Sequence, residues 1–556
     1  MNSSRLRGLV ACQLLLVFGW LSQPTSVLSE EAGQPETHET WRSVLYPVDW
    51  SPTDEDDHGR FLHDFSFAGY AMGSRPIPDL SSAPVIIVEG ADPTGESDST
   101  QAIQQAIDDA GEIVASGAST HAIVQLPAGT LRVSLPEGAR ACLSIRRSGV
   151  VLRGSVEGET RLFGSDRVMR GKQVVAVGSG DWSSTAGAPI ELARDVPNRA
   201  TEIPLESIEG VEVGEWVVLR ADVTDAFIED NGMQDWWTTR LAGPMFYRQI
   251  QSIDASASTV TIDIPTRHPL LRRDRARLIR ARPHISEVGI ENLKIGSLCF
   301  LGQGFGSNDY NQEGTAAYNI HGAHVITVRH VVDGWIRDVH SFAPPGSHQN
   351  RHMPSNGLLL IQCRNVTVER CEMSHPQYEG AGGNGYGFTL RGNDCLVTNC
   401  EVVSSRHAYD FKSMYSSGNV VHRSTSRDAF LPSDFHMHLS MSNLFDCMTM
   451  DGDFLEARVR PWGSTNKHGH ATTQSVFWNT TGLRPHRGKT YVVLSRQFGH
   501  GYVIGTQGDT TDVVTRPTED HGRETAPEDF VEGEGRGATL VPQSLYEDQR
   551  RRRWNR

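Results

Sequence analysis

Short segments that alternate apolar and polar residues recur through the second half of the chain, and a turn follows each one. Units of this length cannot bury a core alone, so they must stack on one another. The period predicts an all-β protein, a right-handed parallel β-helix, because a propeller blade takes ~40–50 residues and is too long. The first residues of the aligned segments, at spacings of 32, 29, 24, 23 and 32 residues, are Ile336, Val368, Val397, Val421, Leu444 and Val476.

Residues 99–110 carry the periodicity of a helix instead. Asp98, just before them, is of a residue type that caps helix N-termini. Short strands are expected after this helix, as far as Leu152. The apolar residues that form one helical face, at i, i+3, i+4 and i+7, are Ile103, Ala106, Ile107 and Ala110.

Changes in composition divide the chain into parts. Between 165 and 283 turns are frequent, and we interpret this stretch as an inserted small β-domain. Its aromatic residues, such as Trp216 and Trp237, are expected to form a core rather than a sugar-stacking platform. The predicted parts are a signal peptide (1–29), an N-terminal extension strapped onto the helix (30–84), the helix and first coils (85–164), the inserted β-rich domain (165–283), the main parallel β-helix (284–515) and a flexible C-terminal tail (516–556).

The N-terminus predicts export. It has basic residues, then an apolar run from Leu9 to Leu21, then a small-residue cleavage site ending near Ser29. The run is too short for a span of ~20 residues, so we expect a secreted or periplasmic protein with no membrane span. The chain has 52 Lys+Arg and 67 Asp+Glu, a net charge of −15, which disfavours nucleic-acid binding by phosphate neutralisation.

Motifs around the predicted helix resemble the opening of the pectate-lyase-like right-handed parallel β-helix superfamily, in its rhamnogalacturonase/epimerase-like branch. The resemblance implies that the helix caps the N-terminal end of the coils. It also implies a carbohydrate-active protein, since members are mostly polysaccharide lyases and glycosidases, with epimerases and phage tailspikes among them. The Asn-Thr-Asp and Arg-Ile-Lys motifs of polygalacturonases are absent, so their catalytic residues cannot be transferred. The motifs are Ala91-Asp-Pro-Thr-Gly-Glu-Ser-Asp-Ser-Thr-Gln-Ala-Ile103, Val124-Gln-Leu-Pro-Ala-Gly-Thr-Leu-Arg-Val133 and Gly149-Val-Val-Leu-Arg-Gly154.

Strand segments between 405 and 474 carry charged side chains on the face that should point away from the core. Residues two apart on a strand share a face, so Asp434, His436 and His438 point outward while Phe435 and Leu439 point into the core. Consecutive coils lie ~4.8 Å apart, so these faces would form one polar wall. The predicted catalytic residues are Arg406, Asp410, His436, His438, Glu456 and Arg458, and the predicted substrate-binding residues are Lys412, Asp434, Arg460, His468, His470 and Gln474.

Two enzymatic chemistries fit this wall. A polysaccharide lyase removes the C5 proton of a uronic acid, and needs a base and a cation that neutralises the carboxylate. The surplus of Arg and His favours this chemistry on an anionic polysaccharide. A glycoside hydrolase needs two carboxyl groups about 5–5.5 Å or 6.5–9.5 Å apart, which Asp410, Asp434 and Glu456 on adjacent rungs would supply. The non-enzymatic hypothesis is a β-helix that binds glycans without cleaving them.

No cofactor is clearly indicated, and a divalent metal is a further hypothesis. Calcium needs a cluster of oxygen ligands, whereas Asp451 and Asp453 offer only two carboxylates. A transition metal would use the nitrogen ligands of the wall, in the set Asp434, His436, His438, His468 and His470.

Overall fold

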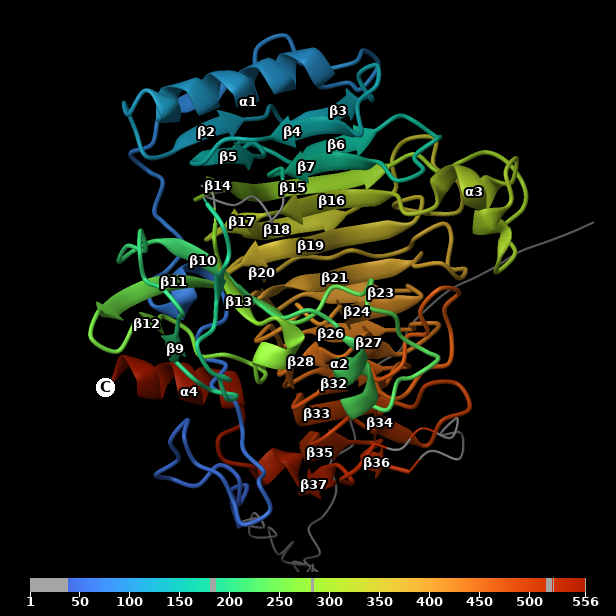
Figure 1. The fold of residues 1–556 in the computed structure, drawn as a ribbon. Coiled ribbons are helices and arrows are strands. Elements are labelled where there is room, and N and C mark those ends of the chain that lie inside the picture. The colour runs from blue at the N-terminus through green and yellow to red at the C-terminus, as the bar shows by residue number, and fades with distance from the viewer. Residues whose placement is uncertain (1–38, 181–186, 282–284, 517–522, 524, 556) are drawn as a thin grey trace, which may run out of the picture. The chain divides into compact units, whose positions relative to one another are not determined.

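Parallel strands stacked in coils build the body of the protein (Figure 1). The computed structural model describes residues 39–180, 187–281, 285–516, 523 and 525–555, so the predicted signal peptide lies outside the described residues. Thr40–Arg556 forms one unit by its internal contacts. None of the described helices is long and apolar enough to cross a membrane.

Two parallel sheets form the walls of the coils among the described residues, which confirms the right-handed parallel β-helix. The larger sheet has 17 strands. They are β1 (Val85–Ile87), β2 (Ala122–Gln125), β3 (Gly129–Val133), β5 (Val150–Arg153), β6 (Thr160–Gly164), β15 (Gly289–Ser297), β18 (Trp335–Ser341), β20 (Thr367–Glu369), β22 (Leu396–Thr398), β23 (Glu401–Val403), β25 (Val420–His422), β26 (Thr425–Arg427), β29 (Leu444–Asp446), β30 (Thr449–Asp451), β33 (Val476–Arg484), β35 (Tyr502–Gly508) and β37 (Phe530–Glu532).

The second parallel sheet has 12 strands and carries the polar wall. They are β4 (Ala141–Ile145), β7 (Gln173–Val177), β14 (Ile285–Ser286), β16 (His324–Arg329), β17 (Val331–Val332), β19 (Asn356–Arg364), β21 (Tyr386–Asn393), β24 (His407–Lys412), β27 (Ser433–Met437), β31 (Leu455–Ala457), β34 (Tyr491–Ser495) and β36 (Asp512–Val514). A small two-stranded sheet joins β28 (Ser440–Met441) and β32 (Thr472–Thr473).

Helix α1 (Thr100–Ala115) covers the N-terminal end of the stack, as expected (Figure 1). Ser99 occupies the N-cap position rather than Asp98, whose carboxylate instead accepts a hydrogen bond from the Thr100 backbone N–H at 2.9 Å. The predicted apolar face is buried in the main core. The remaining helices are α2 (Asp225–Asp230), α3 (Ala316–Ile320) and α4 (Leu545–Trp554), with 3-10 turns at Tyr70–Gly73, Arg272–Asp274, Asp309–Asn311 and Gly537–Thr539.

The aligned repeats stack in neighbouring coils, but with a register shift. Val421 pairs with Phe445, and Val420 pairs with Leu444, so the predicted alignment of Val421 with Leu444 is wrong by one residue. A shift of one residue exchanges the two faces of a strand. Phe445 therefore lies in the core of the helix, whereas Leu444 and Val476 face outward and pack under other parts of the chain.

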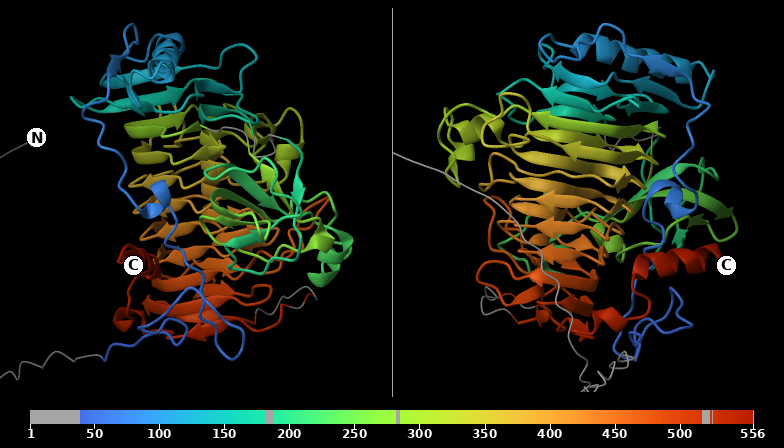
Figure 2. Two further views of the ribbon diagram at one scale, coloured as in Figure 1. Left: turned by 60° about the vertical axis from the view of Figure 1, so that its left-hand side comes forward. Right: turned by 180° about the vertical axis from the view of Figure 1, so that it is seen from behind.

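The chain ends pack on this outward row of apolar side chains. Leu45, Tyr46 and Trp50 from the N-terminal segment lie in one cluster with Leu545 of α4. The expectation of a flexible tail is wrong for the described residues from 530 to 555, because β37 adds a coil by pairing with β35 and the N-terminus of α4 is anchored by hydrogen bonds to Asp446. Figure 2 shows the N-terminal segment and α4 on the same flank of the stack.

The inserted domain is an antiparallel sheet on the side of the stack (Figure 2). Its predicted start at 165 is too early, because β7 pairs with β4 and β16 and its apolar residues lie in the main core. Trp237 and Phe246 belong to the core of the insert, as expected. The six strands are β8 (Ile190–Glu191), β9 (Glu202–Pro204), β10 (Trp216–Arg220), β11 (Met245–Asp254), β12 (Thr259–Ile262) and β13 (Arg277–Arg280).

Replacing Phe445 with alanine tests the observed register. The phenyl ring is fully buried and lies 5.2 Å from the ring of Phe435 and 5.8 Å from that of Phe477. We expect Phe445→Ala to lower the free energy of unfolding by about 3–5 kcal/mol in chemical denaturation. The control Phe430→Ala, at a side chain that is 62% exposed, should change it by no more than about 0.5 kcal/mol. Equal effects would contradict the register.

A carboxyl group buried at a corner of the coils makes stability depend on pH. Asp453 accepts hydrogen bonds from Ser426 and Ser433, at 2.6 and 2.8 Å, and burial raises its pKa to about 7. The folded protein then holds a proton that the unfolded chain releases near pH ~3.9, so this group makes stability fall as pH rises from about 4 to 7. We expect Asp453→Asn to stabilise the protein by about 2–4 kcal/mol above pH 7, and not near pH 4. Asp512→Asn, at an exposed position, should show no such pH dependence in thermal unfolding.

Candidate active site

Three carboxylates stack on the outer face of the 12-stranded sheet. Asp410 of β24 pairs in register with Asp434 of β27, which pairs with Glu456 of β31. These residues lie on adjacent rungs, as the spacing predicted, with neighbouring strands ~4.8 Å apart. All three are buried. Such a stack requires cations between the carboxylates, because unpaired buried charges are costly.

Lysine and arginine neutralise the stack. The Nζ atom of Lys412 lies 3.0 Å from Oδ2 of Asp410, and Nη2 of Arg460 lies 2.7 Å from Asp434 and 2.5 Å from Glu456. Burial raises the pKa of Asp410, only partly offset by Lys412. Burial would also raise the pKa of Asp434, but Arg460 and two histidines outweigh it and hold this pKa well below its usual value. The pKa values of the neighbouring Asp410 and Asp434 carboxyl groups are thus shifted in opposite directions.

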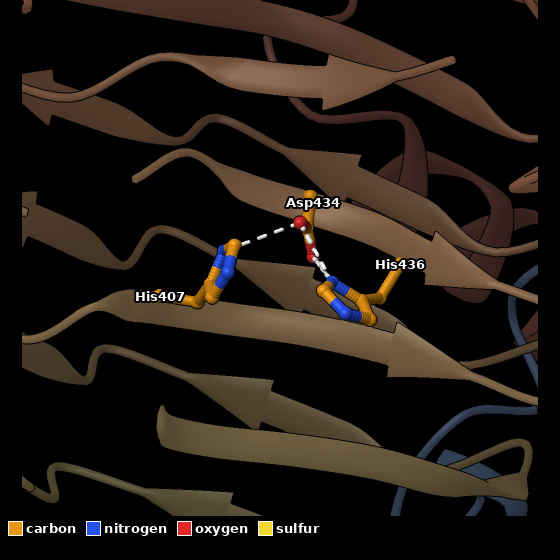
Figure 3. A group of neighbouring side chains, drawn as sticks. All are labelled: His407, Asp434 and His436. Carbon is orange, nitrogen blue, oxygen red and sulfur yellow. Dashed lines mark hydrogen bonds and ion pairs between the residues drawn. The ribbon is translucent and has the colours of Figure 1, made fainter. Parts of the chain in front are cut away.

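Two imidazoles contact the Asp434 carboxylate from different strands (Figure 3). Nδ1 of His407 lies 3.2 Å from Oδ2, and Nδ1 of His436 lies 3.0 Å from the same oxygen. His407 Nδ1 also lies 2.6 Å from the Pro432 carbonyl, so it is the protonated nitrogen of that ring. Burial lowers the pKa of His436 well below its ordinary value. His436 is therefore neutral near pH 7.

Tyr386, at the start of β21, completes the cluster. Its hydroxyl lies 3.2 Å from Nε2 of His436 and accepts a hydrogen bond from Arg406 at 3.2 Å. Its ring stacks on His407, with centroids 4.8 Å apart, and Lys412 Nζ lies 3.3 Å from the ring centroid. Burial raises the pKa of this phenol, so it keeps its proton near pH 7. The hydroxyl is a proton donor or relay with a base beside it.

Tyr386 and His407 are not among the residues that the sequence predicted for the site, and an irregularity of the strands is the reason. Ala408 and Tyr409 are consecutive, yet both lie in the core of the helix. The alternation of faces is therefore reversed between them, so His407 points outward and strict parity assigned it to the wrong side. The small residues Gly387 and Ala408, which lie at the same level of β21 and β24, are a local sign of this irregularity.

The structure brings most of the predicted site residues together, but not all of them. His470 is buried elsewhere, with Nε2 2.9 Å from the carbonyl of Asn231 in the insert. Gln474 turns away in a left-handed conformation, at φ 56°, and accepts a hydrogen bond from Tyr502. The cluster contains Asp410, Lys412, Asp434, His436, Glu456 and Arg460; Arg406, His438 and His468 lie half-buried around it, and Arg458 is half-buried with its guanidinium 5.8 Å from the Trp462 ring centroid.

The polar wall is buried rather than solvated. Beyond Met437 the strand ends, because His438 and Leu439 both have φ 50°, and Leu439 packs in the core of the insert rather than in that of the helix, where it was expected. The insert thus covers the wall at the end of β27. Burial lowers the pKa of His438 to about 4 and that of His468 to about 3. The imidazoles expected to add positive charge are therefore neutral.

A metal ion does not fit this cluster. Ligand atoms of His407, Asp434 and His436 lie within 4.8 Å of one another. However, Nη1 of Arg460 lies 2.7 Å from Nδ1 of His436, and its Nη2 binds Asp434, so a guanidinium already occupies the side where an ion would bind. Calcium would need about 6–8 oxygen ligands. The predicted set with His438 and His470 is not assembled either.

No protein-family model and no curated protein sequence matches this chain. Solved structures are similar at low identity. ORF18 of Geobacillus virus E2 is 13% identical, with a TM-score of 0.35, over 78% of this chain and 58% of that one. The tailspike protein gp49 of Pseudomonas phage LKA1 is 12% identical, with a TM-score of 0.37, over 76% and 75%. The A-module of the Azotobacter vinelandii mannuronan C-5 epimerase AlgE4 is 15% identical, with a TM-score of 0.33, over 80% and 100%.

These similarities carry no argument about activity, because every TM-score is far below 0.5. The chain spans 58% of the length of the Geobacillus virus protein. The β-helix itself follows from the strand pairing of this chain, and the resemblance to the pectate-lyase-like superfamily stays a prediction.

Proposed function

We propose that the protein cleaves a polysaccharide containing uronic acids by β-elimination, and that Tyr386 and His436 transfer the proton. One observation carries the proposal. The phenol and the imidazole contact each other at 3.2 Å in a cluster whose three carboxylates are each held by a lysine or an arginine. The cluster therefore favours removal of a proton from a substrate carbon over hydrolysis, in which the carboxyl groups themselves would act as acid, base or nucleophile.

His436 is arranged to exchange a proton with Tyr386. With the proton on Nδ1, the ring donates to Asp434 and Nε2 accepts from the Tyr386 hydroxyl. With the proton on Nε2, Nδ1 accepts from Arg460, at 2.7 Å, and Nε2 donates to Tyr386. Only the form with the proton on Nδ1 leaves Nε2 free to accept the Tyr386 proton, and the imidazolium that results would be stabilised by the Asp434 carboxylate, 3.0 Å from Nδ1. Tyr386 would take the substrate proton as its own proton passes to His436.

Arg406 supplies the cation that the chemistry requires. It is half-buried and, among the residues that the structure describes, its charge has no carboxylate partner; its guanidinium contacts Tyr386. Placed beside the uronate carboxylate, it would stabilise the negative charge that develops when the neighbouring carbon loses its proton. Within the cluster, the side chains of His436 and Lys412 are partly open to solvent, at 9% and 10% exposed.

The step balances without a cofactor. The C5 proton goes to the Tyr386–His436 pair, and the C–H electrons form the C4=C5 double bond. The C4–O bond breaks with its electron pair, and the leaving oxygen takes a proton from water. The product is an unsaturated uronate and a new chain end.

A glycoside hydrolase is the second candidate, because one observation favours it. Asp410 and Asp434 lie on adjacent rungs with pKa values shifted in opposite directions, which is how an acid and a base are separated in such sites. However, both are fully buried in this structure. Tyr386 is also buried, at 2% exposure, but its hydroxyl contacts the half-buried Arg406.

Product analysis separates these hypotheses. The purified protein is incubated with carboxylated and neutral polysaccharides, and both ultraviolet absorbance and reducing ends are followed. A lyase produces absorbance from the new double bond together with reducing ends. A hydrolase produces reducing ends alone, and a glycan-binding protein produces neither signal. Reducing ends without absorbance would overturn the proposed β-elimination.

We also propose that the protein is exported, since a polysaccharide outside the cell can be cleaved only by an exported enzyme. The basic and apolar N-terminal segment supports removal of residues 1–29. We expect N-terminal sequencing of protein recovered from the periplasm or the medium to begin near Glu30. A mature protein that keeps Met1 would contradict this.

A further inference from the structure

A polar cleft runs beside the buried cluster. It has a volume of about 650 Å³ and is lined by the turns that precede β19, β21, β24, β27, β31 and β34, each from a successive coil. Equivalent turns of neighbouring coils lie ~4.8 Å apart, so the cleft follows the axis of the helix. A second pocket, of about 490 Å³, continues it, because Gln349 and Arg351 line both. Such an elongated site suits a polymer.

The cleft adjoins the cluster through Arg406. Ser405 lines the cleft, and Arg406 is the next residue. Gly385 packs between the two sites: a β-carbon there would lie 2.8 Å from Cβ of Arg406 and 3.0 Å from Cα of Glu379, which also lines the cleft. Arg406 therefore lies between the cleft and Tyr386. A chain in the cleft would pass next to this arginine.

The charges of the cleft favour an anion. Arg351 is paired with Glu379 at 3.3 Å and Arg484 with Asp428 at 2.6 Å, so these charges compensate one another. Arg487 is exposed and, within the described part of the chain, has no carboxylate partner. On a protein with a net charge of −15, Arg487 gives the lining of the cleft an excess positive charge, and Arg406 adds another beside the lining residue Ser405. Guanidinium groups match carboxylate and sulfate geometry.

An aromatic side chain lies on the same wall. Phe430 lines the cleft and is 62% exposed. Its backbone is fixed, since its N–H donates to the Ser405 carbonyl at 2.8 Å and its carbonyl lies 3.2 Å from Nε2 of His486. The ring is thus held in solvent on a rigid turn. Together with the arginines, it offers both an apolar surface and charges to a sugar chain.

We propose that this cleft binds an anionic polysaccharide along the helix axis, with acidic groups paired to Arg487 and Arg406 and a sugar face packed on Phe430. Only one part of this proposal rests on the proposed function, namely that the bound polysaccharide passes next to Tyr386. Binding itself does not require catalysis.

Calorimetric titration of the full-length protein tests the cleft. The probes are polygalacturonate and alginate, which carry carboxylates, heparin, which carries sulfates, and dextran, which is neutral. We expect at least one anionic probe to bind with an affinity that falls with salt, and dextran to bind much more weakly. Arg487→Ala and Phe430→Ala should each lower that affinity about tenfold.

Arg272→Ala is the matched control, because it removes an exposed charge from the insert, where Arg272 pairs with Glu206. It should leave affinity unchanged. If no anionic probe binds, or if Arg272→Ala weakens binding as much as Arg487→Ala, the cleft proposal is overturned.

The same variants separate this proposal from the proposed function. Tyr386→Phe should bind the probe normally, whatever its activity. If the wild type binds through Arg487 and Phe430 but forms no product, the cleft stands and β-elimination falls. If the wild type forms the unsaturated product while both cleft variants bind like the wild type, β-elimination stands and the cleft falls.

Discussion

Replacing Tyr386 with phenylalanine is expected to lower turnover by roughly 10²-fold or more, the usual effect of losing a group that transfers a proton. The substitution removes only the hydroxyl, which contacts His436 and Arg406, and keeps the ring that stacks on His407. His436→Ala should lower turnover by a similar factor. Initial rates on a polysaccharide that the wild type cleaves, with the KM determined separately, measure the effect.

Tyr415→Phe is the matched control. Its hydroxyl is also buried against an arginine, Arg391, at 2.6 Å, but lies outside the cluster. It should retain most of the activity. Full activity in both Tyr386→Phe and His436→Ala would show that the cluster is structural, and a loss in Tyr415→Phe as large as in Tyr386→Phe would mean that the effect is not specific.

Replacing Arg460 with leucine is expected to lower the free energy of unfolding by about 3–5 kcal/mol. The guanidinium is buried between Asp434 and Glu456, so its removal leaves two buried carboxylates without their main partner. The folded-state pKa of Asp434 is depressed, so its ion pair stabilises the protein above the unfolded pKa of ~3.9 and loses this effect as pH falls further. The difference between variant and wild type should therefore be largest near neutral pH.

Arg272→Leu is the control for this experiment. Arg272 and Glu206 form an ion pair in which both side chains are more than half exposed, at 54% and 53%. Such pairs contribute only ~0.2–1 kcal/mol. Denaturation curves at pH 7 and near pH 2 compare the variants, and an Arg460→Leu protein as stable as Arg272→Leu at pH 7 would contradict the ionic network described above.

The local elements and much of the stacking of the coils could be predicted from the residue pattern alone. The face of α1 could be predicted because helical spacing is a local property. The adjacency of Asp410, Asp434 and Glu456 could be predicted because the coils between them are nearly equal in length, at 24 and 22 residues. Both inferences need only the period of the chain.

The face of the strand on which a side chain lies, and the register between neighbouring strands, depend on tertiary contacts. Alternation assigns a face only while the strand is regular, and it fails at Ala408–Tyr409 and after Met437. These irregularities hid Tyr386 and His407 from the prediction and placed Leu439 against the insert. The one-residue shift at Leu444 has a similar origin, because the register depends on which apolar side chains the neighbouring coils and the chain ends can bury.

Burial of the site also came from the tertiary structure. Sequence patterns give the charge of a side chain but not what covers it, and the insert and neighbouring rungs cover this wall. Desolvation then removes the charge of the histidines and makes the carboxylates depend on Arg460 and Lys412. The tail likewise looked flexible by composition, yet α4 packs on apolar side chains from coils about a hundred residues earlier in the chain. Contacts between distant segments decide such features, and no local pattern encodes them.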